Sequence, residues 1–220
     1  MLMRHGETEN NRLGKFQGSR VDIPLNDTGV QQAEAAAATL TPGRWAKVFS
    51  SDLVRAAQTA RIIATKLGAP VEEIAEFRER DLGELDGRPR AQYAQEHPEG
   101  VQKLLTDMDY APEGGETRRA VFARFLAGLD RVFRAAGSGD QDRLVLIVAH
   151  GGLLDVAVRQ LLPAQRPGML LGNGRAFSLF AEEAESGGMS LGVCHFDVAL
   201  DECERAWPSP SGRALQALVK

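Results

Sequence analysis

The sequence has little cysteine, no long apolar run and no excess of basic charge. Its two cysteines, Cys194 and Cys203, are too few for a disulfide framework or a four-ligand zinc site, which favours a reducing compartment. The longest apolar stretch, Leu144–Ala149, is far shorter than the roughly 20 residues that cross a bilayer. The net charge of −4 gives no positive field for nucleic acid or an anionic membrane. We therefore expect a cytoplasmic protein that binds neither.

The start of the chain also lacks the features of a secretory signal peptide, because Arg4 and His5 follow the first three residues directly. No internal repeat is present, and the one low-complexity block, Ala35–Ala38, fits a helical pattern. With 220 residues, of which 43% are hydrophobic, the chain can bury one sizeable core. We expect a single α/β domain over residues 1–200, with an irregular, cap-like insertion at about 77–112 and a C-terminal tail over residues 201–220. The sequence leaves an oligomer possible.

Strand-like and helix-like segments alternate along the chain. Strands are expected near residues 1–3, 47–50, 71–74, 144–148, 176–180 and 191–198, and helices near 26–40, 53–67, 90–96, 101–107, 117–137 and 151–162. The continuous aliphatic run Leu144–Val148 is typical of a central parallel strand that is covered on both faces. This alternation predicts a three-layer α/β/α sandwich with a mostly parallel central sheet.

Histidines follow two of the predicted strands. His5-Gly6 comes directly after the first strand, and His150-Gly151 comes directly after the central aliphatic strand. Ligands of such folds bind beyond the carboxyl ends of the strands, and glycine leaves room there for a ligand. The sequence therefore predicts two imidazoles at the edge of one crevice.

A longer set of short motifs follows in order along the chain. Its segments are Arg4-His5-Gly6-Glu7-Thr8, Asn11 with Gln17-Gly18, Asp22 with Pro24-Leu25, Ser50-Ser51-Asp52-Leu53 with Arg55-Ala56 and Thr59-Ala60, Arg78-Glu79 with Gly83 and Asp86-Gly87, Gly114-Gly115-Glu116-Thr117, and Val148-Ala149-His150-Gly151-Gly152. This set resembles the signature of the histidine phosphatase superfamily, also called the phosphoglycerate mutase-like family, and Asn173 resembles a further element of it. The resemblance covers residues 4–152 and implies the phosphoglycerate mutase-like fold.

The residue types suit phosphoryl transfer without a metal or another cofactor. A phosphate monoester dianion repels nucleophiles, so fixed cations and amides must surround its oxygens. Arg4 and Arg55 can bind phosphate through planar paired donors, and their charge keeps His5 neutral and hence nucleophilic. The resemblance implies that His5 forms a phosphohistidine, which water later opens.

The resemblance assigns roles to further residues. His150 would donate to the phosphoryl oxygens, assisted by amides at the start of the following helix, and Asn11 would add another donor. Glu79 would act as general acid and then as base, although it lies in a charge run, Arg78–Asp81, that is also typical of a solvated surface. Secondary contacts are expected from Gln17, Gly18, Gly151 and Lys15. Lys15 stands where many family members have arginine, which keeps the cation and loses the paired donors.

We therefore predict a metal-independent phosphatase that hydrolyses a small phosphorylated metabolite through a phosphohistidine. The stretch between Glu79 and Gly114 lacks the long insertion of the cofactor-dependent phosphoglycerate mutases, which favours hydrolysis over transfer. That mutase activity is the alternative, and a non-catalytic binder of phosphorylated ligands is a third hypothesis. A metal-dependent hydrolase is disfavoured because His5 and His150 accompany arginines instead of a carboxylate cluster.

Overall fold

The computed structural model describes residues 1–136, 144–161, 172–183 and 189–198. The expected tail at 201–220 and the expected helix end at Gly137 lie outside these ranges. Within them, no helix is both long enough and apolar enough to cross a membrane.

Six strands form one mixed sheet, which confirms the predicted fold class. They are β1 (Leu2–Arg4), β2 (Trp45–Ser50), β3 (Val71–Glu73), β4 (Leu144–Ala149), β5 (Ala176–Glu183) and β6 (Met189–Val198), in the order β3-β2-β4-β1-β5-β6. The first four run parallel, and β5 and β6 pair antiparallel at one edge. β4 is a central strand, as its continuous aliphatic sequence predicts.

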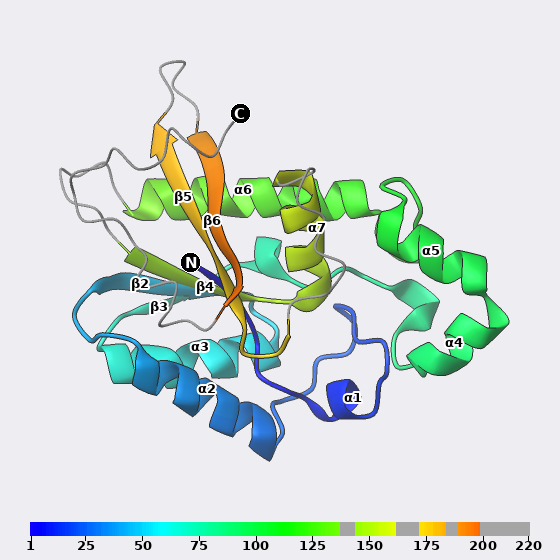
Figure 1. Cartoon of the computed structure of the whole chain (residues 1–220), viewed down its shortest axis with the longest axis horizontal. Coiled ribbons are helices and arrows are strands. Elements are labelled where there is room, and N and C mark those ends of the chain that lie inside the picture. The colour runs from blue at the N-terminus through cyan, green and yellow to red at the C-terminus, as the bar shows by residue number, and fades with distance from the viewer. Residues whose placement is uncertain (137–143, 162–171, 184–188, 199–220) are drawn as a thin grey trace.

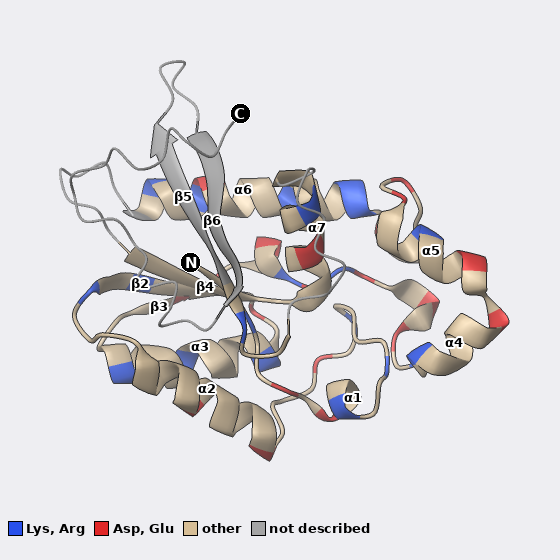
Figure 2. Cartoon of the chain, in the orientation of Figure 1, with Lys and Arg blue, Asp and Glu red and all other residues tan. Residues whose placement is uncertain are grey.

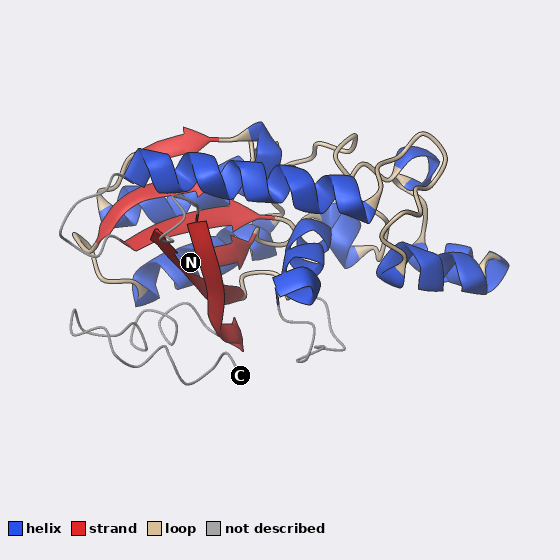
Figure 3. Ribbon diagram, turned by 90° about the horizontal axis from the view of Figure 1, so that it is seen from above, coloured by secondary structure: helices blue, strands red, loops and turns tan. Residues whose placement is uncertain are grey.

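The helices lie on both faces of this sheet and at one end of it (Figures 1 and 3). α2 (Asp27–Thr39) and α3 (Val54–Leu67) cover one face, and α6 (Arg118–Ala136) and α7 (Gly151–Leu161) cover the other. The short helices α1 (Glu9–Arg12), α4 (Arg90–Glu96) and α5 (Pro98–Thr106) lie beyond the sheet. Two turns of 3-10 helix, at Ala75–Phe77 and Gly83–Leu85, connect β3 to α4.

The core follows from the alternation of side chains along the parallel strands. Leu146 and Val148 of β4 pack in the layer of α2 and α3, whereas Ile147 and Ala149 pack in the layer of α6 and α7. Neighbouring Leu2 and Met3 of β1 divide between the two layers in the same way. Burial on both faces fixes the register of β1 on β4, and this register positions the residues that follow the two strands.

One helix boundary and one short, unexpected helix differ from the sequence-based expectation. α5 begins at Pro98 instead of 101, because a proline at the first helical position loses no hydrogen bond and brings a helical φ angle. α1 is a single turn whose sequence has no hydrophobic period to predict it, and a capping box between Thr8 and Asn11 stabilises it. By contrast, Asn26 caps α2 as predicted, since its side chain accepts from the Gly29 amide.

Candidate active site

The register of two neighbouring strands brings His5 and His150 together. Arg4 of β1 pairs with Ala149 of β4, so the next residue of each strand leaves the sheet at the same edge. The His5 amide donates to the Ala149 carbonyl at 3.0 Å, and the two imidazole rings lie 5.1 Å apart, centroid to centroid. The predicted pair of imidazoles is therefore present, and both rings are buried.

The hydrogen bond at one ring nitrogen of His5 sets its tautomer. Nδ1 lies 2.6 Å from the carbonyl oxygen of Gly6. A carbonyl can only accept, so Nδ1 carries the proton of the neutral ring and Nε2 keeps its lone pair. The Gly6 amide donates to Thr59 Oγ1 of α3 at 3.1 Å, which holds this loop against α3. His5 thus has the orientation and tautomer that a nucleophile needs.

Burial and neighbouring cations hold both histidines neutral. Burial lowers the pKa of His5 well below its usual 6.5, and the charges of Arg55 and Arg4 lower it further against the opposing hydrogen bond to Gly6. Burial likewise lowers the pKa of His150 well below 6.5, and Arg55 adds the next largest effect. At neutral pH neither ring carries a charge, which leaves the arginines as the cations of the site.

These depressed pKa values predict a loss of stability in mild acid. In the unfolded chain each histidine takes up a proton near pH 6.5, whereas the folded chain keeps both rings neutral well below that pH. The unfolded state then binds more protons, so the free energy of unfolding falls by about 1.4 kcal/mol per pH unit for each ring as the pH drops below about 6.5.

Urea unfolding of wild type and of His150→Asn, between about pH 7.5 and 5.5, measures this effect. We expect the decline of the variant to be shallower by up to about 1.4 kcal/mol per pH unit, because one of the two rings is gone. Parallel declines in the two proteins would contradict a neutral, buried His150.

Two arginines flank the histidines. Arg4 ends β1 and Arg55 lies in the first turn of α3. Figure 2 shows Lys and Arg positions on α3 and α6, on the two faces of the sheet. Burial lowers the pKa of Arg4 to about 10, which still leaves the guanidinium charged at neutral pH. Arg55 is fully buried, and it donates from Nη1 to the Val21 carbonyl at 2.9 Å and from Nη2 to the Gly18 carbonyl at 3.3 Å. The backbone of the loop that contains Gly18 and Val21 therefore fixes the position of the Arg55 guanidinium.

An amide network lies beside His5. The Oε1 atom of Gln17 accepts from Thr8 Oγ1 at 2.6 Å and from Asn11 Nδ2 at 3.3 Å. Asn173 Nδ2 donates both to the backbone oxygen of His5 at 2.9 Å and to Asn11 Oδ1 at 3.2 Å. Because Gln17 Oε1 accepts from Thr8 and Asn11, the amide nitrogen of Gln17 points away from these two residues. The network therefore orients the side-chain amides of Asn11 and Gln17, which the sequence analysis predicted as site residues.

Several buried polar atoms around His5 lack a hydrogen-bond partner. Among the described residues these include Gln17 Nε2, Arg55 Nε and both ring nitrogens of His150. A buried polar group without a partner costs about 1–3 kcal/mol, so a cluster of them is rare in a site without function. Donors from an amide, a guanidinium and an imidazole, together with the positive charge of Arg4 and Arg55, fit the oxygens of a phosphoryl group.

The Glu79 carboxylate lies at the start of α7. Its Oε2 accepts from the Gly152 amide at 2.8 Å, and its Oε1 accepts from the Leu153 amide at 2.9 Å and from the Arg80 amide at 2.8 Å. Amides at the start of this helix are expected to assist phosphate binding, and two of them, those of Gly152 and Leu153, donate to this carboxylate, which the positive end of the helix dipole also favours. A Cβ on Gly152 would lie 2.6 Å from Glu79 Oε1, so glycine is required for this contact.

A residue that the sequence analysis did not single out, Arg124 of α6, holds the backbone that carries Glu79. Its guanidinium donates to the carbonyls of Glu76, Arg78 and Glu79, and it forms a two-pronged ion pair with Glu116 at 2.8 and 3.0 Å. The signal available in the sequence was Glu116, which belongs to the matched segment Gly114-Gly115-Glu116-Thr117. Glu79 is therefore fixed at both its backbone and its carboxylate.

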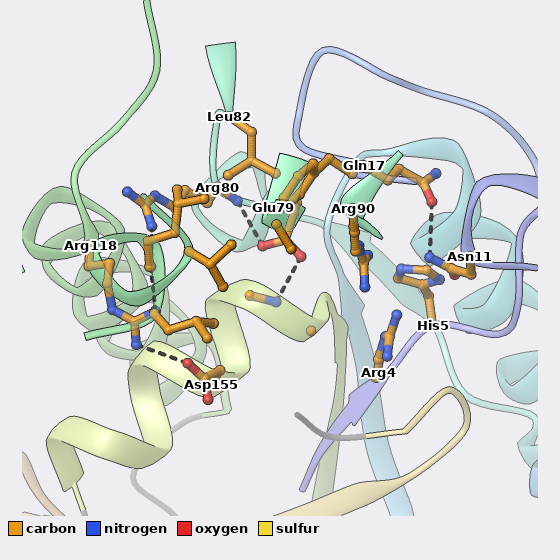
Figure 4. A pocket seen from close by; sticks show the side chains of 17 residues that line it. Arg4, His5, Asn11, Gln17, Glu79, Arg80, Leu82, Arg90, Arg118 and Asp155 are labelled. Atoms are coloured by element: carbon orange, nitrogen blue, oxygen red, sulfur yellow. Dashed lines mark hydrogen bonds and ion pairs between the residues drawn. The ribbon is translucent and has the colours of Figure 1, made fainter. Parts of the chain in front are cut away.

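The site opens into one pocket of about 310 Å³. It is lined by Arg4, His5, Asn11, Phe16, Gln17, Glu79, Arg80, Leu82, Arg90, Ala94, Val101, Leu104, Leu105, Arg118, Gly151, Gly152 and Asp155, and Figure 4 shows the polar members. Of the predicted site residues, Arg4, His5, Asn11, Gln17, Glu79 and Gly151 line it. Arg55 and His150 are not among the lining residues, but both lie beside His5: the His150 ring is 5.1 Å from the His5 ring, and the charge of Arg55 acts on His5.

The two remaining predicted residues contribute in other ways. Gly18 is outside the lining and offers its carbonyl to Arg55. Lys15 is also outside the lining, and its backbone pairs with Pro89. Its neighbours Phe16 and Gln17 line the pocket instead.

Comparison with known proteins gives a consistent result. Residues 1–187 match the sequence profile of the histidine phosphatase superfamily (branch 1). Glucosyl-3-phosphoglycerate phosphatase of Mycolicibacterium vanbaalenii is 34% identical over 181 residues, 80% of each chain. The metal-independent phosphoserine phosphatase of Arabidopsis thaliana is 33% identical over 175 residues, 78% of this chain and 71% of that one.

Solved structures show the same relationship. A mycobacterial glucosyl-3-phosphoglycerate phosphatase, in complex with VO3, matches with a TM-score of 0.76 at 30% identity, and the match covers 89% of this chain and 96% of that one. Family profile, relatives and fold agree with the paired histidines at the sheet edge, and the chain belongs to branch 1 of the histidine phosphatase superfamily.

Proposed function

We propose that this chain hydrolyses a small phosphorylated metabolite, with His5 as the nucleophile and without a metal. The observation that carries the proposal is the group of buried, unpartnered polar atoms on Gln17, Arg55 and His150 beside His5. These atoms can bind the non-bridging oxygens of a phosphoryl group, whose charge Arg4 and Arg55 offset. Relatives named as phosphatases of phosphoserine and of glucosyl-3-phosphoglycerate support a hydrolase that acts on small phosphomonoesters.

The reaction then takes two steps. In the first, Nε2 of His5 attacks phosphorus, the bond from phosphorus to the ester oxygen breaks, and Glu79 gives a proton to that oxygen. In the second, water attacks the phosphohistidine, the phosphorus–nitrogen bond breaks, and Glu79 takes a proton from the water. Inorganic phosphate leaves, and His5 and Glu79 return to their starting states. The proton of His5 stays on Nδ1, hydrogen-bonded to the Gly6 carbonyl, throughout, so the ring always attacks with Nε2.

Arg90 of α4 adds a cation to the pocket that the sequence analysis missed. It lines the pocket, stacks over the Phe16 ring at 5.8 Å, and interacts electrostatically with Glu79 and Arg4. Apolar side chains of the insertion, Val101 and Leu104 among them, form another part of the pocket wall. The pocket volume, of about 310 Å³, and this mixed lining suit a small molecule. With a net charge of −4 and two cysteines, we place the enzyme in the cytoplasm and assign no nucleic-acid or membrane partner.

The test is release of inorganic phosphate from a panel of phosphorylated metabolites and p-nitrophenyl phosphate, in buffer with EDTA. We expect release from at least one metabolite ester, undiminished by EDTA. Activity that needs an added divalent cation would contradict the metal-independent mechanism. Isomerisation of a phosphoglycerate that depends on 2,3-bisphosphoglycerate, with little release of phosphate, would favour the mutase instead.

A further inference from the structure

The pocket has a second polar end. His5, Asn11 and Gln17 lie at one end in Figure 4, Arg118 and Asp155 lie at the other, and Glu79 lies between them. If the phosphoryl group binds at His5, as proposed above, the ester oxygen lies near Glu79 and the rest of the leaving alcohol extends toward Arg118. This end of the pocket therefore faces the part of the substrate that differs from one phosphomonoester to another.

The ion pair at this end is buried among apolar side chains. Arg118 Nη2 donates to Asp155 Oδ2 at 2.9 Å, and the two side chains are only 4% and 5% exposed. Val101, Leu104 and Leu105 line the same pocket. Burying an ion pair costs several kcal/mol per ion, and apolar residues of similar volume are often at least as stable in its place. Stability alone therefore does not account for charges in this wall.

The pair is also incomplete. The Nε and Nη2 atoms on one edge of an arginine commonly bind both oxygens of a carboxylate, as Arg119 does with Asp109 at 2.7 and 2.8 Å. In the buried pair only Nη2 is used, because the other Asp155 oxygen accepts from Arg159 Nε at 2.8 Å. Within the described part of the chain, Arg118 Nε is buried and has no hydrogen-bond partner.

We propose that Arg118 and Asp155 determine substrate specificity by binding a hydroxyl group at the end of the leaving alcohol remote from the phosphate. A hydroxyl oxygen accepts from Arg118 Nε–H, and its proton is donated to the adjacent Asp155 carboxylate. A carboxylate at the same place would face the negative charge of Asp155. A methyl group would leave Nε unsatisfied. The inference rests on the proposed phosphatase activity.

A merely structural role for Arg118 is the competing explanation. Arg118 Nη1 approaches the Leu104 carbonyl at 3.4 Å and so connects α6 to the end of α5. However, Arg80 Nη1 donates to the same carbonyl at 2.9 Å, and its other nitrogens bind the carbonyls of Tyr110 and Glu116. The helix end is therefore held without Arg118.

The experiment compares kcat/KM for alkyl phosphates and for the corresponding ω-hydroxyalkyl phosphates, over a series of increasing chain length. For the wild type we expect the hydroxylated ester to be preferred at least about tenfold at the chain length that reaches Arg118. In the double variant Arg118→Met/Asp155→Leu the ratio should fall to about one. The matched control is Arg119→Met/Asp109→Leu, which removes an exposed ion pair made by the neighbouring residue of α6 and should keep the wild-type ratio.

The other outcomes would contradict the specificity role, the hydroxyl assignment or the phosphatase activity. No preference at any chain length, or a preference that survives in the double variant, would overturn the specificity role. A stronger preference for ω-carboxyalkyl phosphates would overturn the hydroxyl assignment. No turnover of any ester would instead refute the proposed function. If the double variant does not fold, Arg118→Lys keeps the charge opposite Asp155 and removes the Nε donor, so its ratio should also fall toward one.

Discussion

His5→Ala should abolish turnover of every phosphomonoester while the protein stays folded. In the proposed mechanism the variant removes the lone pair that attacks phosphorus, and His150 already has another role there, as a donor to the phosphoryl oxygens. Loss of a covalent nucleophile costs on the order of 10⁶-fold in kcat in the serine proteases, and we expect at least about 10⁴-fold here. The measurement is phosphate release at saturating substrate for wild type and variant.

Two controls separate a lost nucleophile from a damaged fold. His97→Ala removes an exposed histidine between α4 and α5 and should leave kcat unchanged. An alkaline quench during turnover, followed by mass spectrometry, should find one phosphoryl group on the His5 peptide of the wild type and none on the variant. A phosphorylated residue elsewhere, or a variant with more than about a tenth of the wild-type kcat, would contradict the covalent role.

The paired histidines were predictable because their position depends on strand order and register. The aliphatic run of β4 and the short apolar start of β1 identify two buried strands, and glycine after each histidine indicates a turn out of the sheet. The parallel pairing of Arg4 with Ala149 then follows from the fold class. The ordered motifs added Arg55 and Glu79, which lie far from His5 in the sequence and near it in the structure.

The end of the pocket at Arg118 and Asp155 could not be predicted in the same way. Arg90 and Arg118 belong to no matched motif, and the insertion between Glu79 and Gly114 has no period that would tell which side chains face inward. Asp155 lies on a helix whose pattern is dominated by apolar residues, where a single acid carries no directional signal. The contacts that α6 makes with α5 and with α7 bring Leu104, Arg118 and Asp155 to one wall.

The same limitation applies to the start of α7. A helix that starts directly after His150 has free amides at its first turn, and from sequence alone a phosphate is a reasonable ligand for them. The sequence does not show that the distant Glu79 reaches Gly152 and Leu153 first. The consequence is functional, because the carboxylate that we assign as acid and base is bound by backbone amides of the helix that directly follows His150.

Glu79→Gln should slow hydrolysis of alkyl phosphates far more than hydrolysis of p-nitrophenyl phosphate. The oxygen of an alkyl alcohol must be protonated as it leaves, whereas p-nitrophenolate leaves without a proton. Loss of the acid should therefore lower kcat/KM about 10²- to 10⁴-fold for alkyl phosphates and less than about tenfold for p-nitrophenyl phosphate. We choose kcat/KM because it reports the steps up to phosphoryl transfer to His5 and excludes the later attack of water. The comparison thus isolates the acid role of Glu79 from its base role.

The design must allow for the structural contacts of this carboxylate. Glutamine keeps the shape of Glu79, but its NH2 group faces one of the three amides that now donate to the two oxygens, at a cost of about 1–3 kcal/mol in stability. A melting curve measures that cost, and Glu84→Gln, at an exposed position nearby, is the matched control that should change neither rate nor stability. A general disturbance of the site would slow both classes of ester equally. Equal losses would therefore remove Glu79 from the acid role, whereas a loss confined to alkyl phosphates would establish that the carboxylate at the start of α7 protonates the leaving oxygen.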